Sequence, residues 1–115
     1  MKILFIILLL LFIIAYVYTL TGEQKISSER AKELIEKGAR VIDVRTNIEW
    51  NLGHYPDALH VPVNKLKSTK LPLSKNDVII VYCNTGQRAR AAAEILMSLG
   101  YEKTYYIASS YISLL

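Results

Sequence analysis

The chain has 115 residues, which is enough for one small domain, and 52% of them are hydrophobic. Its net charge of +4 comes from scattered basic residues, and no basic helix or aromatic-interleaved stripe indicates nucleic-acid binding. The single cysteine, Cys83, excludes a disulfide within the chain and argues against a thiolate metal cluster. We therefore expect one domain that holds neither a metal nor another cofactor.

The first 21 residues form a separate, strongly apolar segment. From Ile3 to Tyr18 every residue is apolar or aromatic. A helix of about 18 residues would reach about 27 Å, close to the thickness of a bilayer core. A cleaved signal peptide is the alternative, but Thr19-Leu20-Thr21 is a poor cleavage site. The sequence thus predicts a transmembrane anchor, or an uncleaved signal, over 1–21, and a single-pass membrane protein. Basic residues after the segment favour a cytoplasmic domain over 22–115.

The first half of the domain predicts a helix, a strand and a short turn. Serines at its start and Gly38 at its end favour a helix over 28–37. The β-branched run 41–44 is typical of a buried parallel strand that ends in charged residues. Residues 47–50 suit a single helical turn, and the turn-rich loop 53–57 follows.

The second half alternates strands with one long helix. A short strand is expected over 58–61, and the apolar run 78–82 is the strongest strand signal in the chain. Helix-forming residues fill 89–99 before Gly100, and a last strand is expected over 104–107. This order predicts an α/β fold with a mostly parallel central sheet flanked by helices, preceded by one N-terminal transmembrane helix.

The loop between the strongest strand and the long helix carries the candidate chemistry. Ligands of an open α/β sheet bind where its central strands end. Gly86 lets such a loop curl so that backbone N–H groups point inward, and the helix start adds partial positive charge. These groups would stabilise the thiolate of Cys83, which is the nucleophilic form. We expect Arg88 to face an anion. A structural Cys83, a small buried side chain at a strand end, is the alternative.

Two ordered motifs resemble the rhodanese family. The first contains the strand with Asp43-x-Arg45, the pair Glu49-Trp50 and the run from Gly53 to Ala58, and the second is the strand followed by the Cys-x-x-Gly-x-Arg loop 83–88. The resemblance extends from about residue 26 to the end of the chain. It implies a rhodanese-like fold and a sulfurtransferase.

The resemblance also implies a mechanism and a set of site residues. Cys83 would take a sulfane sulfur from a donor such as thiosulfate, hold it as a persulfide, and pass it to a thiol or cyanide. Asp43, Arg45 and His54 would support the site. The residues expected to bind substrate are Asn84, Thr85, Gly86, Gln87 and Arg88.

The sequence departs from the family pattern at two places. Asp57 stands where the family usually has glycine, so a non-glycine residue must accept that turn. Ser109-Ser110 and Leu114-Leu115 replace the family's Gly-Gly and tryptophan. The second difference bears on the C-terminal helix and part of the substrate rim rather than on the catalytic loop.

Two other functions stay open at the level of sequence. Phosphatases and arsenate reductases share the fold but need five residues between cysteine and arginine, whereas four residues separate Cys83 from Arg88. A non-catalytic, membrane-tethered interaction module with this fold is the other alternative. A zinc site made by His54, Asp57 and His60 would lack a further ligand.

Overall fold

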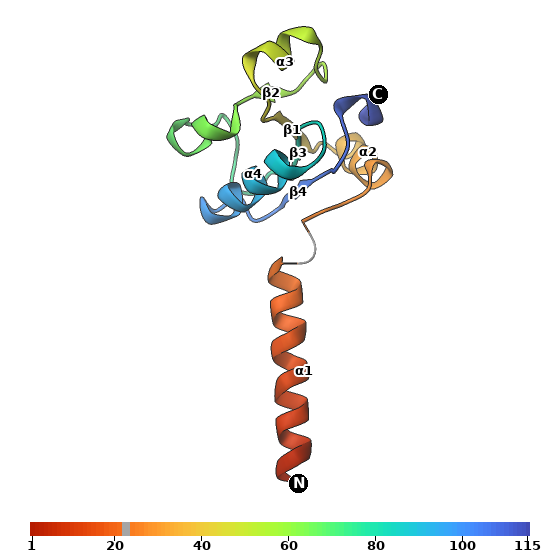
Figure 1. Cartoon of the computed structure of the whole chain (residues 1–115), viewed down its shortest axis with the longest axis vertical. Coiled ribbons are helices and arrows are strands. Elements are labelled where there is room, and N and C mark those ends of the chain that lie inside the picture. Colours follow the sequence, from red (N-terminus) through yellow and green to blue (C-terminus); the bar gives the residue numbers. More distant parts are fainter. Residues whose placement is uncertain (22–23) are drawn as a thin grey trace.

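The computed structural model describes residues 1–21 and 24–115, and it describes the side chains of 1–17 and 24–115. Helix α1 (Lys2–Thr21) precedes the domain and extends away from it (Figure 1). The domain begins with α2 (Ser28–Glu36), β1 (Arg40–Asp43) and α3 (Asn47–Leu52). Then come β2 (Leu59–His60), the 3₁₀ helix η1 (Val63–Ser68), β3 (Ile79–Tyr82), α4 (Gln87–Ser98), β4 (Thr104–Tyr106) and the 3₁₀ helix η2 (Tyr111–Leu114).

The four strands form one parallel sheet in the order β2-β1-β3-β4. Strand β3 lies at its centre, and all four of its residues are buried, as its uninterrupted apolar sequence predicts. Successive side chains of a strand point to opposite faces, so the sheet supports two clusters. One cluster joins Ile79 and Val81 to α4 and η1, and the other joins Ile80 and Tyr82 to α2 and η2. The predicted parallel α/β sheet flanked by helices is therefore confirmed.

The prediction of a membrane anchor is contradicted. Within the described part of the chain, no helix is both long enough and apolar enough to cross a membrane. This finding corrects the predicted transmembrane anchor over 1–21, the membrane-anchored type of protein and the single-pass membrane localisation.

The two departures from the family pattern have simple structural solutions. No described residue other than glycine has a positive φ, so the turn at Asp57 does not require glycine. At the other departure, the Ser109 hydroxyl lies 3.0 Å from that of Ser28 and 2.8 Å from that of Ser113. These hydrogen bonds connect the segment before η2 to the first turn of α2 and hold the C-terminal part of the domain against the sheet.

Candidate functional site

Cys83 lies directly after the central strand β3, and its side chain is only 1% exposed. Its Sγ atom accepts hydrogen bonds from the backbone N–H groups of Gly86, at 3.2 Å, and Ala89, at 3.3 Å. Gly86 has a φ of 104°, in the left-handed region that glycine adopts readily, and this conformation turns the chain from the loop into α4. The sulfur therefore sits at the floor of a backbone cradle, with the positive end of a helix beside it.

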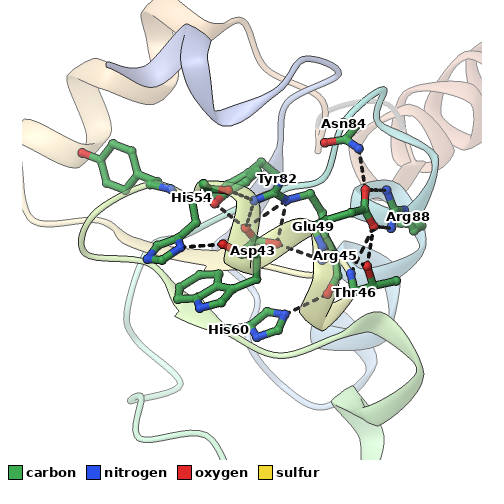
Figure 2. A network of polar contacts seen from close by, with 12 residues as sticks. Asp43, Arg45, Thr46, Glu49, His54, His60, Tyr82, Asn84 and Arg88 are labelled. Carbon is green, nitrogen blue, oxygen red and sulfur yellow. Dashed lines mark hydrogen bonds and ion pairs between the residues drawn. The ribbon is translucent and has the colours of Figure 1, made fainter.

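Glu49 in α3 holds the loop at both ends (Figure 2). Its two carboxylate oxygens accept hydrogen bonds from Nη1 and Nη2 of Arg88, at 2.6 and 2.9 Å, and one of them also accepts from Nδ2 of Asn84. The Thr46 backbone N–H and hydroxyl donate to the same carboxylate, in the capping box that begins α3. The Arg88 hydrogen bonds hold the pKa of Glu49 far below its usual value, and they raise the pKa of Arg88.

A second, more deeply buried network connects the end of β1 to the end of β3 (Figure 2). Arg45, which is 5% exposed, donates three hydrogen bonds from Nε and Nη2 to the fully buried carboxylate of Asp43 and one from Nη2 to the carbonyl of Gly53. The Tyr82 hydroxyl also donates a hydrogen bond to Asp43 and accepts one from the backbone N–H of Tyr55. Burial and the hydrogen bond to Asp43 raise the pKa of Tyr82, so its hydroxyl keeps its proton. Burial opposes the charge of Arg45, but its bonds to Asp43 outweigh this and raise its pKa.

The imidazole rings of His54 and His60 both stack on the indole ring of Trp50. The rings of His54 and Trp50 stack with centroids 3.4 Å apart, and those of His60 and Trp50 stack at 4.6 Å. Nδ1 of His54 lies 2.9 Å from the Trp50 carbonyl oxygen, and Nε2 of His60 lies 2.8 Å from that of Arg45. Both imidazoles are thus tied to the main chain, and they fix the loop that joins α3 to β2.

Comparisons with known proteins agree with this geometry. A family model described as a rhodanese-like domain matches residues 27–113, which is most of the chain. The chain belongs to this family.

Individual relatives of this rhodanese-like domain include named sulfurtransferases. The human single-domain sulfurtransferase TSTD1 superposes with a TM-score of 0.68, at 28% identity, over 80% of this chain and 95% of that one. The thiosulfate sulfurtransferase PspE of Escherichia coli is 38% identical over 63 residues, which are 52% of this chain and 60% of PspE. The putative sulfur carrier protein YrkF of Bacillus subtilis is 28% identical over 69% of this chain and 44% of YrkF. The chain thus spans about half the length of the curated relatives PspE and YrkF.

The structure brings most of the predicted site residues of the rhodanese-like domain together. Cys83 and the loop residues 84–88 follow the end of β3, and the ion pair of Asp43 and Arg45 lies at the end of the neighbouring strand β1. The guanidinium of Arg88 faces Glu49, and its contact with an anionic substrate stays a prediction. Sequence reasoning did not assign Glu49 or Tyr82 to the site. The capping-box spacing from Thr46 to Glu49 was visible, but nothing in it indicates a partner 39 residues later.

Proposed function

We propose that this chain is a sulfurtransferase that carries a sulfane sulfur on Cys83. The observation that carries the proposal is the buried Sγ atom, which accepts hydrogen bonds from two backbone N–H groups at the carboxyl end of the central strand. Such donors stabilise negative charge on sulfur, whether it is a thiolate or the sulfur of a persulfide. The named relatives TSTD1 and PspE support the same class of reaction.

The reaction has two steps that return the enzyme to its starting state. The Cys83 thiolate attacks the outer sulfur of a donor such as thiosulfate, the donor's S–S bond breaks, and sulfite leaves with the bonding electrons. Cys83 then carries a persulfide, whose outer sulfur is attacked by a thiolate or by cyanide. The bond to that sulfur breaks and regenerates the Cys83 thiolate, while the acceptor leaves as a persulfide or thiocyanate.

The surrounding residues have distinct roles in this proposal. The backbone N–H groups of the loop 84–88, from Asn84, Thr85, Gly86, Gln87 and Arg88, surround the transferred sulfur. Asp43 and Arg45 keep the strand ends in place, and His54 positions the loop after α3. Contact between Arg88 and an anionic donor remains a prediction, since its guanidinium is engaged by Glu49 in the free protein.

Formation of the persulfide tests this proposal directly. We expect mass spectrometry of the full chain after incubation with thiosulfate to show one added sulfur atom on Cys83, which cyanide removes as thiocyanate. Cys83→Ser should abolish both signals, because a serine hydroxyl cannot hold a transferable sulfane sulfur. If the native chain takes up no sulfur from thiosulfate or from a small persulfide donor, the sulfurtransferase assignment is wrong and a non-catalytic binding module replaces it.

A further inference from the structure

A small cavity lies on the outer flank of the catalytic loop. It has a volume of about 190 Å³, and its lining includes loop residues 85–87, Lys25, Arg90 and Tyr106. Among the described residues that line this cavity, two are basic and none is acidic. The cavity therefore offers positive charge beside the loop that follows Cys83.

The cavity matters because the cation expected to bind an anion is already engaged. Both terminal nitrogens of Arg88 donate to Glu49, and Asn84 donates to the same carboxylate. A paired guanidinium attracts a further anion only weakly, since the carboxylate cancels its charge. An anionic group that enters the cavity thus meets Lys25 and Arg90, the two basic residues among its lining.

Lys25 is held at the cavity by its backbone. The Tyr106 N–H donates to the Gln24 carbonyl at 2.7 Å, and the Ile26 N–H donates to the Tyr106 carbonyl at 2.9 Å. These two bonds make a short parallel bridge that adds Lys25 to the edge of the sheet beside β4. The lysine stem therefore leaves from a fixed point next to the loop.

Arg90 belongs to the first turns of α4. Its only ion pair among the described residues is with Glu94, at 3.5 Å, and both side chains are more than 60% exposed. Exposed i,i+4 pairs of this kind contribute only about 0.3 to 0.5 kcal/mol, so Arg90 can exchange Glu94 for a ligand at little cost. The guanidinium is therefore available to an anion in the cavity.

We propose that this cavity is a subsite for the carboxylate of a small acidic thiol, which is the acceptor of the sulfur that Cys83 carries. The proposal rests on the sulfurtransferase function proposed above. Gly86 connects the cavity to the sulfur of Cys83, because its N–H donates to the Sγ atom while the residue itself lines the cavity. A carboxylate held by Lys25 and Arg90 would thus leave a thiol on the same molecule within reach of the persulfide.

Transfer to such an acceptor balances without any further reagent. The acceptor thiolate attacks the outer sulfur of the Cys83 persulfide, and the bond between that sulfur and the Cys83 Sγ atom breaks. The electron pair of this bond stays on Cys83 as a thiolate, and the acceptor leaves as a persulfide. The carboxylate in the cavity takes no part in bond making; it only orients the thiol.

A matched pair of acceptors tests the subsite in the full chain. N-acetylcysteine carries one carboxylate, and N-acetylcysteine amide replaces it with a neutral group of the same shape. With the persulfide loaded beforehand, we expect Lys25→Gln and Arg90→Gln each to lower kcat/KM for N-acetylcysteine about two- to fivefold, as for exposed charge pairs. The amide should react equally in all variants. Arg30→Gln, which removes an exposed arginine paired with Glu33 on α2, is the control and should change neither acceptor.

A binding measurement separates this proposal from the proposed function. In full-length Cys83→Ser, N-acetylcysteine should shift the backbone amide NMR signals of residues 85–87, its amide should not, and Lys25→Gln combined with Arg90→Gln should remove the shift. If the persulfide forms but the variants treat both acceptors alike, and no charge-dependent shift appears, the subsite is wrong while the sulfurtransferase survives. If no persulfide forms, the function fails and the NMR titration alone decides whether the cavity binds a carboxylate.

Discussion

Glu49 joins three parts of the molecule through a single carboxylate. It caps the start of α3 with Thr46, and it binds Asn84 and Arg88 on either side of the loop that follows Cys83. Its side chain is 26% exposed, so solvent screens these contacts only in part. The carboxylate therefore contributes both to stability and to the position of the amides around the sulfur.

The depressed pKa of Glu49 makes stability depend on pH. Because its folded-state pKa lies below the usual value of 4.5, the carboxylate's contribution is complete above that pH and is lost as the pH falls through the folded pKa. We expect Glu49→Gln to lower the free energy of unfolding by about 1 to 2 kcal/mol at neutral pH, the value of a partly exposed charged hydrogen bond. Urea denaturation followed by Trp50 fluorescence measures this, and the difference from the native chain should shrink in acid.

A suitable control for this prediction is Glu94→Gln. Glu94 is 62% exposed and pairs with Arg90 at 3.5 Å, so its removal should change stability by less than about 0.5 kcal/mol at either pH. A Glu49→Gln variant whose deficit stayed constant from neutral pH into acid would show that the Glu49 charge is not what stabilises the loop.

At the scale of elements, the connection between β3 and α4 depends on one backbone conformation. Gly86 combines a positive φ with a close approach to the segment after β4, since a Cβ atom there would lie 2.9 Å from the Ala108 Cα atom. A residue with a Cβ atom is disfavoured by the positive φ and would also clash with Ala108. The same residue supplies one of the two N–H groups bound to the Cys83 sulfur.

Replacing this glycine should therefore damage stability and chemistry together. We expect Gly86→Ala to cost about 1 to 3 kcal/mol of unfolding free energy through backbone strain and overpacking. Moving the amide by about 1 Å should lower the rate of sulfur transfer about a hundredfold. Thermal denaturation and thiocyanate formation measure the two effects.

Gly38 provides the matched control for the Gly86 variant. Its φ of 102° is almost the same, but a Cβ atom at Gly38 would meet nothing within 4 Å. Gly38→Ala should therefore cost only the conformational penalty of about 1 kcal/mol and leave sulfur transfer unchanged. Equal losses of activity in the two variants would mean that the position of the Gly86 amide does not matter.

The sequence predicts those elements of the fold that depend on neighbouring residues. The strand β3 is predicted by its apolar run, and the spacing of Cys83, Gly86 and Arg88 in the loop after it is what marks the candidate site in the sequence. Contacts across long separations were not predictable in the same way. Glu49 and Arg88 are 39 residues apart, as are Asp43 and Tyr82, and only the folded sheet brings each pair together. Helix α4 also begins at Gln87 rather than at the expected 89, because the left-handed Gly86 turns the chain early.

At the scale of the whole molecule, both sides of the sheet depend on the same strands. Leu66 of η1 lies fully buried in the cluster against α4, whereas Tyr82 lies fully buried in the cluster against α2 and η2. The clusters share β1 and β3, whose alternate side chains point to the two faces. A loss of packing on one side of the sheet should therefore also destabilise the cluster on the other side.

The final prediction tests this coupling with Leu66→Ala. The substitution empties a site that is 0% exposed, and such changes cost about 2 to 5 kcal/mol because they lose apolar contact and leave a cavity. If the domain unfolds as one unit, urea transitions followed by Trp50 fluorescence and by near-ultraviolet tyrosine circular dichroism should coincide and should move by the same amount. The second signal follows both faces, because Tyr101 lies in the Leu66 cluster whereas Tyr82 and Tyr111 lie on the opposite face. Two separated transitions, with only one shifted by the substitution, would show that the faces unfold independently and that the Cys83 loop is not stabilised by the whole core.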